Sequence, residues 1–455
     1  MTHLSISKTT HPFEIFTSSR FSAFVLRGYV DIDEYEYGQS HSEGRLSSSA
    51  RRMAAWLPDT YSVPGLGLAQ LAFDTVPNRD LMHASRNRPL QIALVAPSMG
   101  ILGGQAVQAD RLLRAWNGDP DVRAWLVPIN PIPPGFLRRA VEVKYLRTIA
   151  TQLTYWPLLL RELRRADVVH VFSASYVSFL LAPLPAVLIA KLLGKPVLLN
   201  YHSGEAPDHL RRSAIARRTL RWVERNAVPS PFLQDVFADF GIESEVIPNT
   251  VDVDRFRFRT RSPFRPKVLS TRNFEPMYNV SCTLRAFRLL QDRYPEATLT
   301  LVGAGSEDHR LRELARELRL EHVRFVGRVA PDDIWRYYRD ADIYLQTPDI
   351  DNMPLSVLEA FASGCAVVST NAGGVPAILT DGKHGLLVES GDHRAAAERT
   401  ARLLADPALA ERLTAAARES CAGYEWNVVR SRWLALYESM VTPHGPVSEP
   451  SARAV

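Results

Sequence analysis

Twice along the sequence, short apolar runs alternate with segments of helical periodicity. The first series starts at Gln91–Ala96, and the second restarts at Lys267–Ser270 after an Arg- and Pro-rich stretch at 252–266. Strands and helices that alternate in this way form parallel sheets with helices on both faces, so the sequence predicts an α/β fold with two Rossmann-like, doubly wound sheet domains. Such sheets bind ligands beyond the carboxyl ends of their strands, and two facing domains place the expected site in the cleft between them.

The domain boundaries are predicted from changes in composition. At roughly 150 residues per domain, the length of 455 residues suffices for two or three domains. Residues 1–88 are rich in Ser, Thr, Tyr and Arg and lack the alternation, so we expect a largely disordered extension there. The first sheet domain is predicted at 89–255 and the second at 256–424, with a C-terminal helix at about 425–442 that packs back on the first domain and a disordered tail at 443–455.

Charge and cysteine content exclude several classes of protein. The net charge of +5 is mild, hydrophobic residues make up an ordinary 46% of the chain, and we expect no nucleic-acid partner. The three cysteines, Cys282, Cys365 and Cys421, are far apart and form no CxxC pair. Neither a disulfide framework nor a cysteine metal site is therefore indicated, which fits a reducing compartment.

A cytoplasmic location is expected. The N-terminus lacks the charged start and apolar core of a signal peptide. The stretch at 168–190 carries no Asp, Glu, Lys or Arg, but His170, Pro183 and Pro185 interrupt it. This stretch is predicted to form a buried strand, a loop and a buried helix rather than a continuous membrane span of about 20 residues.

The segment from Asp349 to Gly364 concentrates residues suited to bind a ligand. Pro354 suits the start of a helix and Gly364 its end. A helix start offers free backbone N–H groups and the positive end of a dipole, which attract a diphosphate. The carboxylates of Asp351 and Glu359 can each accept protons from two neighbouring sugar hydroxyls. Taken alone, however, Ser356 to Glu359 is also an S-x-x-E capping box, in which Glu359 only satisfies a backbone N–H.

Together with the predicted strand and glycine loop after Gly364, this segment resembles glycosyltransferase family 4, a large retaining family with the two-domain GT-B fold. That family has an acidic residue, seven intervening residues and a Glu, then a strand and a Gly-Gly-x-Pro loop. Asp351 and Glu359 have this spacing, with Asp in place of the more usual Glu, and the loop is Gly373-Gly374-Val375-Pro376. The resemblance covers about residues 90–440. It implies a nucleotide-diphosphate sugar as donor, a glycan or lipid-linked acceptor, no cofactor and no metal.

Further positions carry the same resemblance. Arg272 matches the family's arginine that contacts the donor diphosphate, and His202, after a predicted strand, matches the histidine that reaches the transferred sugar. Asp351, Glu359 and His202 are thus the expected catalytic residues. The expected donor site also includes Gly103, Gly104, Gly303, Gly305, Arg328, Met353, Pro354, Leu355 and Ser356. The alternatives are a plain turn at Gly103–Gly104, a structural role for His202 and an ordinary surface position for Arg328.

Two positions depart from the family pattern and motivate other functions. Tyr278 stands where the family commonly has a Lys, six residues after Arg272, and Ala377 stands where a Glu often follows the Pro. An inactive GT-B scaffold protein is therefore the alternative. A third candidate, an NAD-dependent oxidoreductase, is disfavoured because the Gly303-Ala304-Gly305 turn lacks the third glycine of GxGxxG, a position held by Asp308.

A basic helix is predicted at Leu210–Asn226. At about 100° per residue, five arginines fall within an arc of roughly 120°, namely Arg211, Arg217, Arg218, Arg221 and Arg225. A basic amphipathic helix is typical of contact with an anionic membrane, which would favour a lipid-linked acceptor and a peripheral position on the inner face of the plasma membrane. A solvated face is the alternative. Short DxD patterns, such as Asp252-Val253-Asp254, arise easily by chance, and no metal is predicted.

Overall fold

The computed structural model describes residues 88–100, 103–135 and 144–442. The predicted extension at 1–88, except for its last residue, and the predicted tail at 443–455 lie outside the described residues. From Leu90 on, the described chain belongs to one compact unit, which contains two six-stranded sheets.

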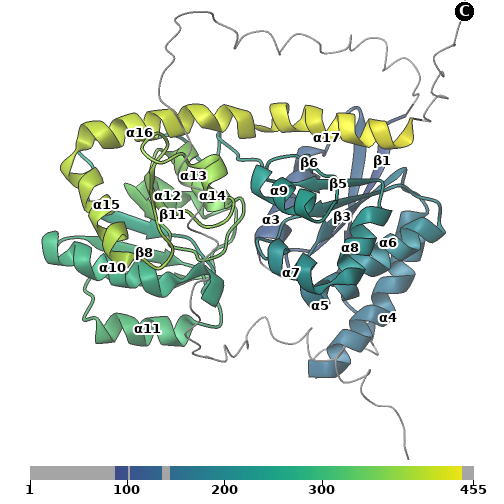
Figure 1. Ribbon diagram of the computed structural model, residues 1–455, viewed down its shortest axis with the longest axis horizontal. Coiled ribbons are helices and arrows are strands. Elements are labelled where there is room, and N and C mark those ends of the chain that lie inside the picture. The colour runs from purple at the N-terminus through teal and green to yellow at the C-terminus, as the bar shows by residue number, and fades with distance from the viewer. Residues whose placement is uncertain (1–87, 101–102, 136–143, 443–455) are drawn as a thin grey trace, which may run out of the picture. The chain divides into compact units, whose positions relative to one another are not determined.

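The first sheet is parallel throughout and has the strand order β2-β1-β3-β4-β5-β6. Figure 1 labels four of these strands, β1, β3, β5 and β6. Its central strand β3 is buried at all six positions, as expected for a strand covered by helices on both faces. The chain runs from β1 to β2 on one side and to β3 on the other, so a ligand crevice is expected at the carboxyl ends of β1 and β3. The strands are β1 (Leu90–Ala96), β2 (Val122–Pro128), β3 (Val168–Ser173), β4 (Val197–Tyr201), β5 (Arg225–Val228) and β6 (Glu245–Val246). The helices are α3 (Gly104–Ala115), α4 (Lys144–Leu163), α5 (Tyr176–Leu181), α6 (Pro183–Leu192), α7 (Ala206–Arg212), α8 (Ala214–Trp222) and α9 (Pro231–Asp239).

The second sheet repeats this plan with the order β12-β11-β10-β7-β8-β9, again all parallel. Its switch point lies between β7 and β10, so the carboxyl ends of these two strands form the expected crevice. The strands are β7 (Lys267–Ser270), β8 (Thr298–Val302), β9 (Val323–Gly327), β10 (Ile343–Leu345), β11 (Ala366–Thr370) and β12 (Leu386–Val388). The helices are α10 (Val280–Arg293), α11 (Asp308–Glu317), α12 (Trp335–Asp340), α13 (Leu355–Ser363), α14 (Val375–Ile378), α15 (His393–Ala405) and α16 (Pro407–Ser420).

The last helix, α17 (Trp426–Val441), contributes to the core of the first sheet. Its Trp433 and Tyr437 are buried in one cluster with Ile92 and Leu94 of β1. The Tyr437 hydroxyl also lies 2.8 Å from Nδ1 of the fully buried His170 on β3. Apolar burial and a buried hydrogen bond therefore hold the C-terminal helix on the first sheet.

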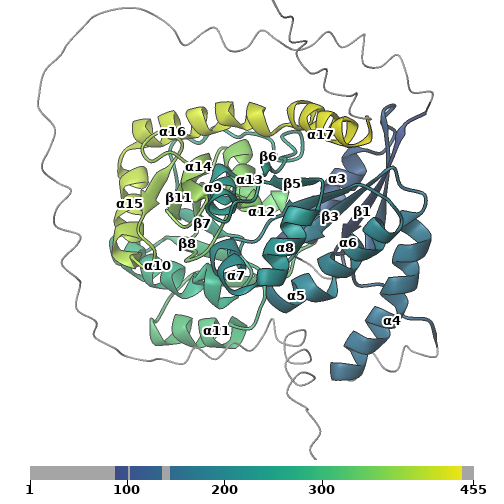
Figure 2. The same cartoon turned by 45° about the vertical axis from the view of Figure 1, so that its right-hand side comes forward.

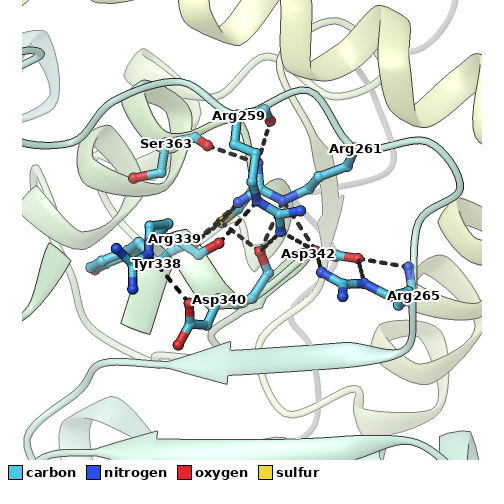
Figure 3. A network of polar contacts seen from close by, with 10 residues as sticks. Arg259, Arg261, Arg265, Tyr338, Arg339, Asp340, Asp342 and Ser363 are labelled. Carbon is cyan, nitrogen blue, oxygen red and sulfur yellow. Dashed lines mark hydrogen bonds and ion pairs between the residues drawn. The ribbon is translucent and has the colours of Figure 1, made fainter. Parts of the chain in front are cut away.

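Three arginines of the segment between the two sheets converge on one buried carboxylate (Figure 3). Arg265 donates to both oxygens of Asp342 over 2.9 and 3.1 Å, and Arg259 donates to Oδ1. The buried Arg261 lies 3.4 Å from the same carboxylate and donates to the Ala341 carbonyl over 2.8 Å. Burial alone would raise the pKa of Asp342, but the hydrogen bonds from Arg265 and Arg259 outweigh it and lower that pKa. The Arg-rich composition of this segment thus has a structural use.

The basic helix predicted at Leu210–Asn226 is wrong. The structure has two short helices, α7 and α8, separated by Ser213, whose backbone is extended and whose hydroxyl caps α8. Arg225 lies in strand β5, and the guanidinium groups of Arg217 and Arg221 donate to backbone carbonyls. A serine side chain that hydrogen-bonds to nearby backbone groups competes with the hydrogen bonds of the helix. The angular pattern of the arginines gives no indication of this break.

Other elements differ from the sequence predictions in smaller ways. β2 and α4 were not predicted. β6 is only two residues long, Glu245–Val246, in keeping with Pro248, which has no N–H to donate to a neighbouring strand. Among the described residues, no helix is long and apolar enough to cross a membrane.

Candidate functional site

Helix α13 begins without a side-chain cap. Its N-cap is Pro354, between Met353 and the first helical residue Leu355. Ser356 lies inside the first turn, and its hydroxyl bonds Gln346 and Arg272 instead of a backbone N–H. The capping box considered for Ser356 and Glu359 is therefore wrong, because a capping serine must stand at the N-cap, which Pro354 occupies. The N–H groups at the start of α13 receive no bond from an N-cap side chain, which leaves this helix end suited to an anion.

Arg272 links the start of this helix to Asp351. It lies just beyond β7, with Nη2 2.8 Å from Oδ2 of Asp351 and with Nη1 donating to Oγ of Ser356 over 3.2 Å. The Arg272 and Asp351 side chains are 9% and 11% exposed. Burial raises the pKa of Asp351, and the charge of Arg272 opposes this. Asp351 Oδ2 makes this ion pair, and among the described residues Arg272 Nε has no hydrogen-bond partner. The pair therefore retains hydrogen-bonding capacity for a ligand.

The ring of Tyr278 packs against Arg272. Tyr278 ends the short 3-10 helix Pro276–Tyr278, and the guanidinium carbon of Arg272 lies 4.0 Å from its ring centroid, well within cation–π distance. Burial raises the pKa of Tyr278, opposed by the charge of Arg272. The position where the resemblance expects a lysine thus holds an aromatic face that partners the arginine.

Close backbone contacts explain three glycines around the Arg272–Asp351 pair. A Cβ at Gly303 would lie 2.0 Å from the Arg272 carbonyl oxygen, and one at Gly305 would lie 2.4 Å from a backbone oxygen of the same loop. A Cβ at Gly373, where φ is +50°, would lie 2.1 Å from the Asp351 carbonyl oxygen. Both glycine loops therefore position the backbone that carries the pair, and any larger residue would displace it.

Glu359 is bonded to an arginine of helix α3. The Glu359 side chain is 7% exposed, and its Oε1 accepts a hydrogen bond from Nη2 of Arg111, whose side chain is 18% exposed. Nη1 of Arg111 lies 3.4 Å from the carbonyl oxygen of Thr250. The sequence predictions missed Arg111. The only feature of the sequence that points to Arg111 is its place on the helix that follows the Gly103–Gly104 loop. An arginine that faces inward there needs a carboxylate partner.

His202 lies directly after β4 and next to the Asp351 loop. Its ring stacks on Phe172 at a centroid distance of 5.2 Å, and its Nε2 has no hydrogen-bond partner within the described ranges. Its carbonyl lies 3.3 Å from the side-chain nitrogen of Asn352, the residue after Asp351. Burial lowers the pKa of His202 to about 4, so its imidazole is neutral at neutral pH. The structure thus brings His202 and Asp351 into one neighbourhood.

The remaining expected donor residues differ in their surroundings. Met353 is buried, and its carbonyl accepts a hydrogen bond from Asn249 over 3.0 Å. A Cβ at Gly103 or Gly104 would meet nothing within 4 Å, so the space beside this loop is open. Arg328, directly after β9, is exposed, and in the described part of the chain no hydrogen bond or ion pair joins it to the other candidate residues.

Two aspartates of the DxD patterns, Asp349 and Asp252, accept hydrogen bonds from nearby groups. Asp349 accepts from Asn279 over 3.1 Å, and Asp252 accepts from the backbone N–H of Arg255 over 3.0 Å. Within the ranges that the structure describes, no three His, Cys, Asp or Glu side chains are grouped so that they could hold a metal ion.

Known proteins match both halves of the chain. Residues 252–420 match the family described as glycosyl transferases group 1, and residues 102–255 match the one described as glycosyltransferase family 4. The phosphatidyl-myo-inositol mannosyltransferase of Mycobacterium leprae is 27% identical over 376 residues, which cover 78% of this chain and 98% of that protein. The sulfoquinovosyl transferase SQD2 of Arabidopsis thaliana is 25% identical over 324 residues, which cover 65% of this chain and 61% of that protein.

Solved structures share the fold. HepE of Anabaena in complex with UDP-glucose has a TM-score of 0.60 at 17% identity and covers 77% of this chain and 99% of its own. Sucrose-phosphate synthase of Thermosynechococcus elongatus has a TM-score of 0.62 at 20% identity and covers 77% of this chain and 98% of its own. The predicted GT-B fold, with two Rossmann-like parallel-sheet domains, is thereby confirmed.

Proposed function

Because the chain belongs to the group 1 glycosyltransferases of the family 4 type and is thus a hexosyltransferase, we propose that it moves a sugar, with retention of configuration, from a nucleotide-diphosphate sugar to a glycan or lipid-linked acceptor. The observation that carries this proposal is the meeting of Arg272, Asp351 and the start of α13 at the switch point of the second sheet. The UDP-glucose in HepE supports the donor class, and the name of the mycobacterial relative supports a lipid-linked acceptor.

Arg272 and the first N–H groups of α13 would stabilise the leaving diphosphate. Negative charge grows on this group as the glycosidic bond breaks, and donors that are already in place lower the energy of that transition state. The planar guanidinium suits two phosphate oxygens at once. With Tyr278 in place of a second cation, the positive charge of this part of the site depends on Arg272.

The two carboxylates would hold the sugars of the donor. Asp351 would accept hydroxyls of the transferred sugar with a carboxylate that Arg272 holds in place. Glu359 would accept hydroxyls of the ribose, while Arg111 bonds its Oε1. Arg111 would thereby orient the carboxylate. The imidazole of His202 is neutral, and it would contact the transferred sugar through an uncharged hydrogen bond.

Donor binding and transfer test the proposal together. In a thermal-shift screen, UDP-, GDP- or ADP-sugars should raise the melting temperature of the wild type, because a ligand that binds only the folded state stabilises it. Asp351→Asn, Glu359→Gln and Arg272→Gln should each lower transfer on the order of a hundredfold or more. Arg285→Gln, at an exposed position of α10, is the control.

Two outcomes would argue against this function. If no nucleotide sugar stabilises the protein, this result would support the alternative of an inactive scaffold protein. That alternative is not favoured, because the two relatives described above are named as transferases. If Asp351→Asn and Glu359→Gln both turn over at the wild-type rate, the assignment of the site is wrong.

A further inference from the structure

Helix α4 carries an apolar stripe on its solvent side. Four large side chains are between 43% and 61% exposed and fall, at 100° per residue, within an arc of about 80°: Leu146, Ile149, Leu153 and Trp156. We call these four residues the α4 stripe. Another side of the helix is fully buried in the core of the first sheet, through Tyr155, Leu159 and Leu163. The α4 stripe is therefore not needed to hold the helix in place.

Helix α6 packs against α4 and adds exposed apolar area. Leu188 is 39% exposed and Leu192 is 78% exposed, and their spacing of four residues puts them on one side of α6. Figures 1 and 2 both show α4 and α6 as neighbours on the outer side of the first sheet. Single exposed apolar residues are ordinary, but a cluster across two adjacent helices marks an interaction surface.

The charges next to the α4 stripe are of one sign. Residues 146–165 contain four arginines and one glutamate, a net charge of +3. Arg147 and Arg164 are exposed, whereas Glu162 is buried and paired with Arg161 and Arg165. No exposed carboxylate on this stretch would therefore repel an anionic surface.

We propose that the α4 stripe docks the protein on the surface of an anionic lipid bilayer. An amphipathic helix with leucine and tryptophan on one side and arginines beside them lies in the interface, with its apolar side chains among the lipids and its charges at the headgroups. Tryptophan is favoured at this depth. A second copy of the chain is a poorer occupant, because a two-fold contact through the stripe would bring the arginines of both copies together. This surface replaces the basic pattern at 210–226 as the membrane contact, and vesicle binding does not depend on the proposed function.

Vesicle sedimentation of the full chain tests the proposal. The wild type should bind vesicles of phosphatidylcholine mixed with phosphatidylglycerol and bind phosphatidylcholine vesicles much less. Ile149→Gln/Leu153→Gln should lower binding to the mixed vesicles at least about tenfold, since two apolar side chains that would insert among the lipids are lost. Arg147→Gln/Arg164→Gln should lower it about thirtyfold, because each basic residue near the surface contributes roughly a factor of five. The controls are Leu289→Gln, at a leucine that is 39% exposed on α10, and Arg285→Gln/Arg394→Gln, at exposed arginines of α10 and α15.

Three results would overturn the proposal. The first is that the wild type does not sediment with mixed vesicles, and the second is that the stripe variants bind like their controls. The third is that sedimentation velocity shows a wild-type dimer that Ile149→Gln/Leu153→Gln converts to a monomer. The last result would identify a second copy as the occupant. If the double variant does not fold, Leu153→Gln alone replaces it, and unchanged donor-induced stabilisation in each variant separates loss of docking from loss of the nucleotide-sugar site.

Discussion

The guanidinium carbon of Arg272 lies 4.0 Å from the centroid of the Tyr278 ring. An aromatic face attracts a cation, whereas a lysine at this position would repel Arg272 while attracting phosphate. With a ring in place of a second cation, Arg272 alone would bind the charge of the donor diphosphate. In the usual family pattern, a Lys and an Arg would bind it together.

Tyr278→Leu should weaken binding of the nucleotide sugar about fivefold to tenfold, because loss of a desolvated cation–π contact costs roughly 1 kcal/mol or more and leaves Arg272 less ordered. Tyr278→Phe keeps the ring and should bind within about twofold of the wild type. Isothermal titration calorimetry with the sugar nucleotide found in the thermal-shift screen measures both. Equal affinities of the Leu and Phe variants would show that the ring does not support Arg272.

Much of the second domain could be predicted from the sequence, because its central strands are short, largely apolar segments bounded by loops. β7 has the bounds predicted for it, Lys267–Ser270. β2 was missed although Ala124–Val127 are apolar; it is an edge strand in which only Val122 and Val127 are buried. The split of Leu210–Asn226 into two helices depends on one local hydrogen bond of Ser213.

For the candidate site, spacing predicted which residues are present but not what they contact. Asp351 and Arg272 meet because each follows a strand at the switch point of one sheet, a relationship that strand order dictates. The bond between Arg111 and Glu359 joins positions 248 residues apart, and no motif marks the arginine. The sequence shows that Tyr278 stands where the family commonly has a lysine. That its ring packs against Arg272 is visible only in the three-dimensional structure.

Arg111 and Glu359 should be energetically coupled. Arg111→Gln leaves a largely buried carboxylate without its partner, which should lower the free energy of unfolding by about 3 kcal/mol. The double variant Arg111→Gln/Glu359→Gln should recover about 1 kcal/mol or more, since no charge is then left unpaired. Urea unfolding of the four proteins gives the coupling energy. Strictly additive effects would mean that the bond contributes nothing to stability.

Acid should destabilise the protein through His170 well above the pH at which carboxylates protonate. Burial, and to a lesser extent His202, lowers the pKa of His170 to about 3, whereas an unfolded histidine has a pKa of about 6.5. Between these values the unfolded chain binds a proton that the folded protein does not. The contribution of His170 to the free energy of unfolding should therefore fall by about 1.4 kcal/mol per pH unit as pH drops below 6.5, and this contribution is fully retained above that pH.

Urea unfolding of His170→Gln at pH 7, 6 and 5 checks this contribution. The variant should be less stable at pH 7, because the bonds to Tyr437 and Asn200 are altered, but its stability should decline less steeply with acid. His309→Gln is the control, since the His309 side chain is 85% exposed. A slope that is the same in His170→Gln and in the wild type would show that His170 does not titrate on unfolding.

Asp342→Asn should destabilise the second domain by about 3 kcal/mol, because three arginines lose the charge that they surround. This is the lower end of the range for a buried pair, since Arg259 and Arg265 reach solvent. The pKa of Asp342 is lowered in the folded state. The contribution of Asp342 to stability is therefore present above the unfolded pKa of about 4 and is lost as pH falls through the folded value.

The control is Asp340→Asn, two residues earlier at a side chain that is 73% exposed, which should change stability by less than about 0.5 kcal/mol. Equal urea midpoints for the two variants would show that the arginine cluster does not depend on the Asp342 charge, whereas a large gap that narrows below about pH 4 would show that it does.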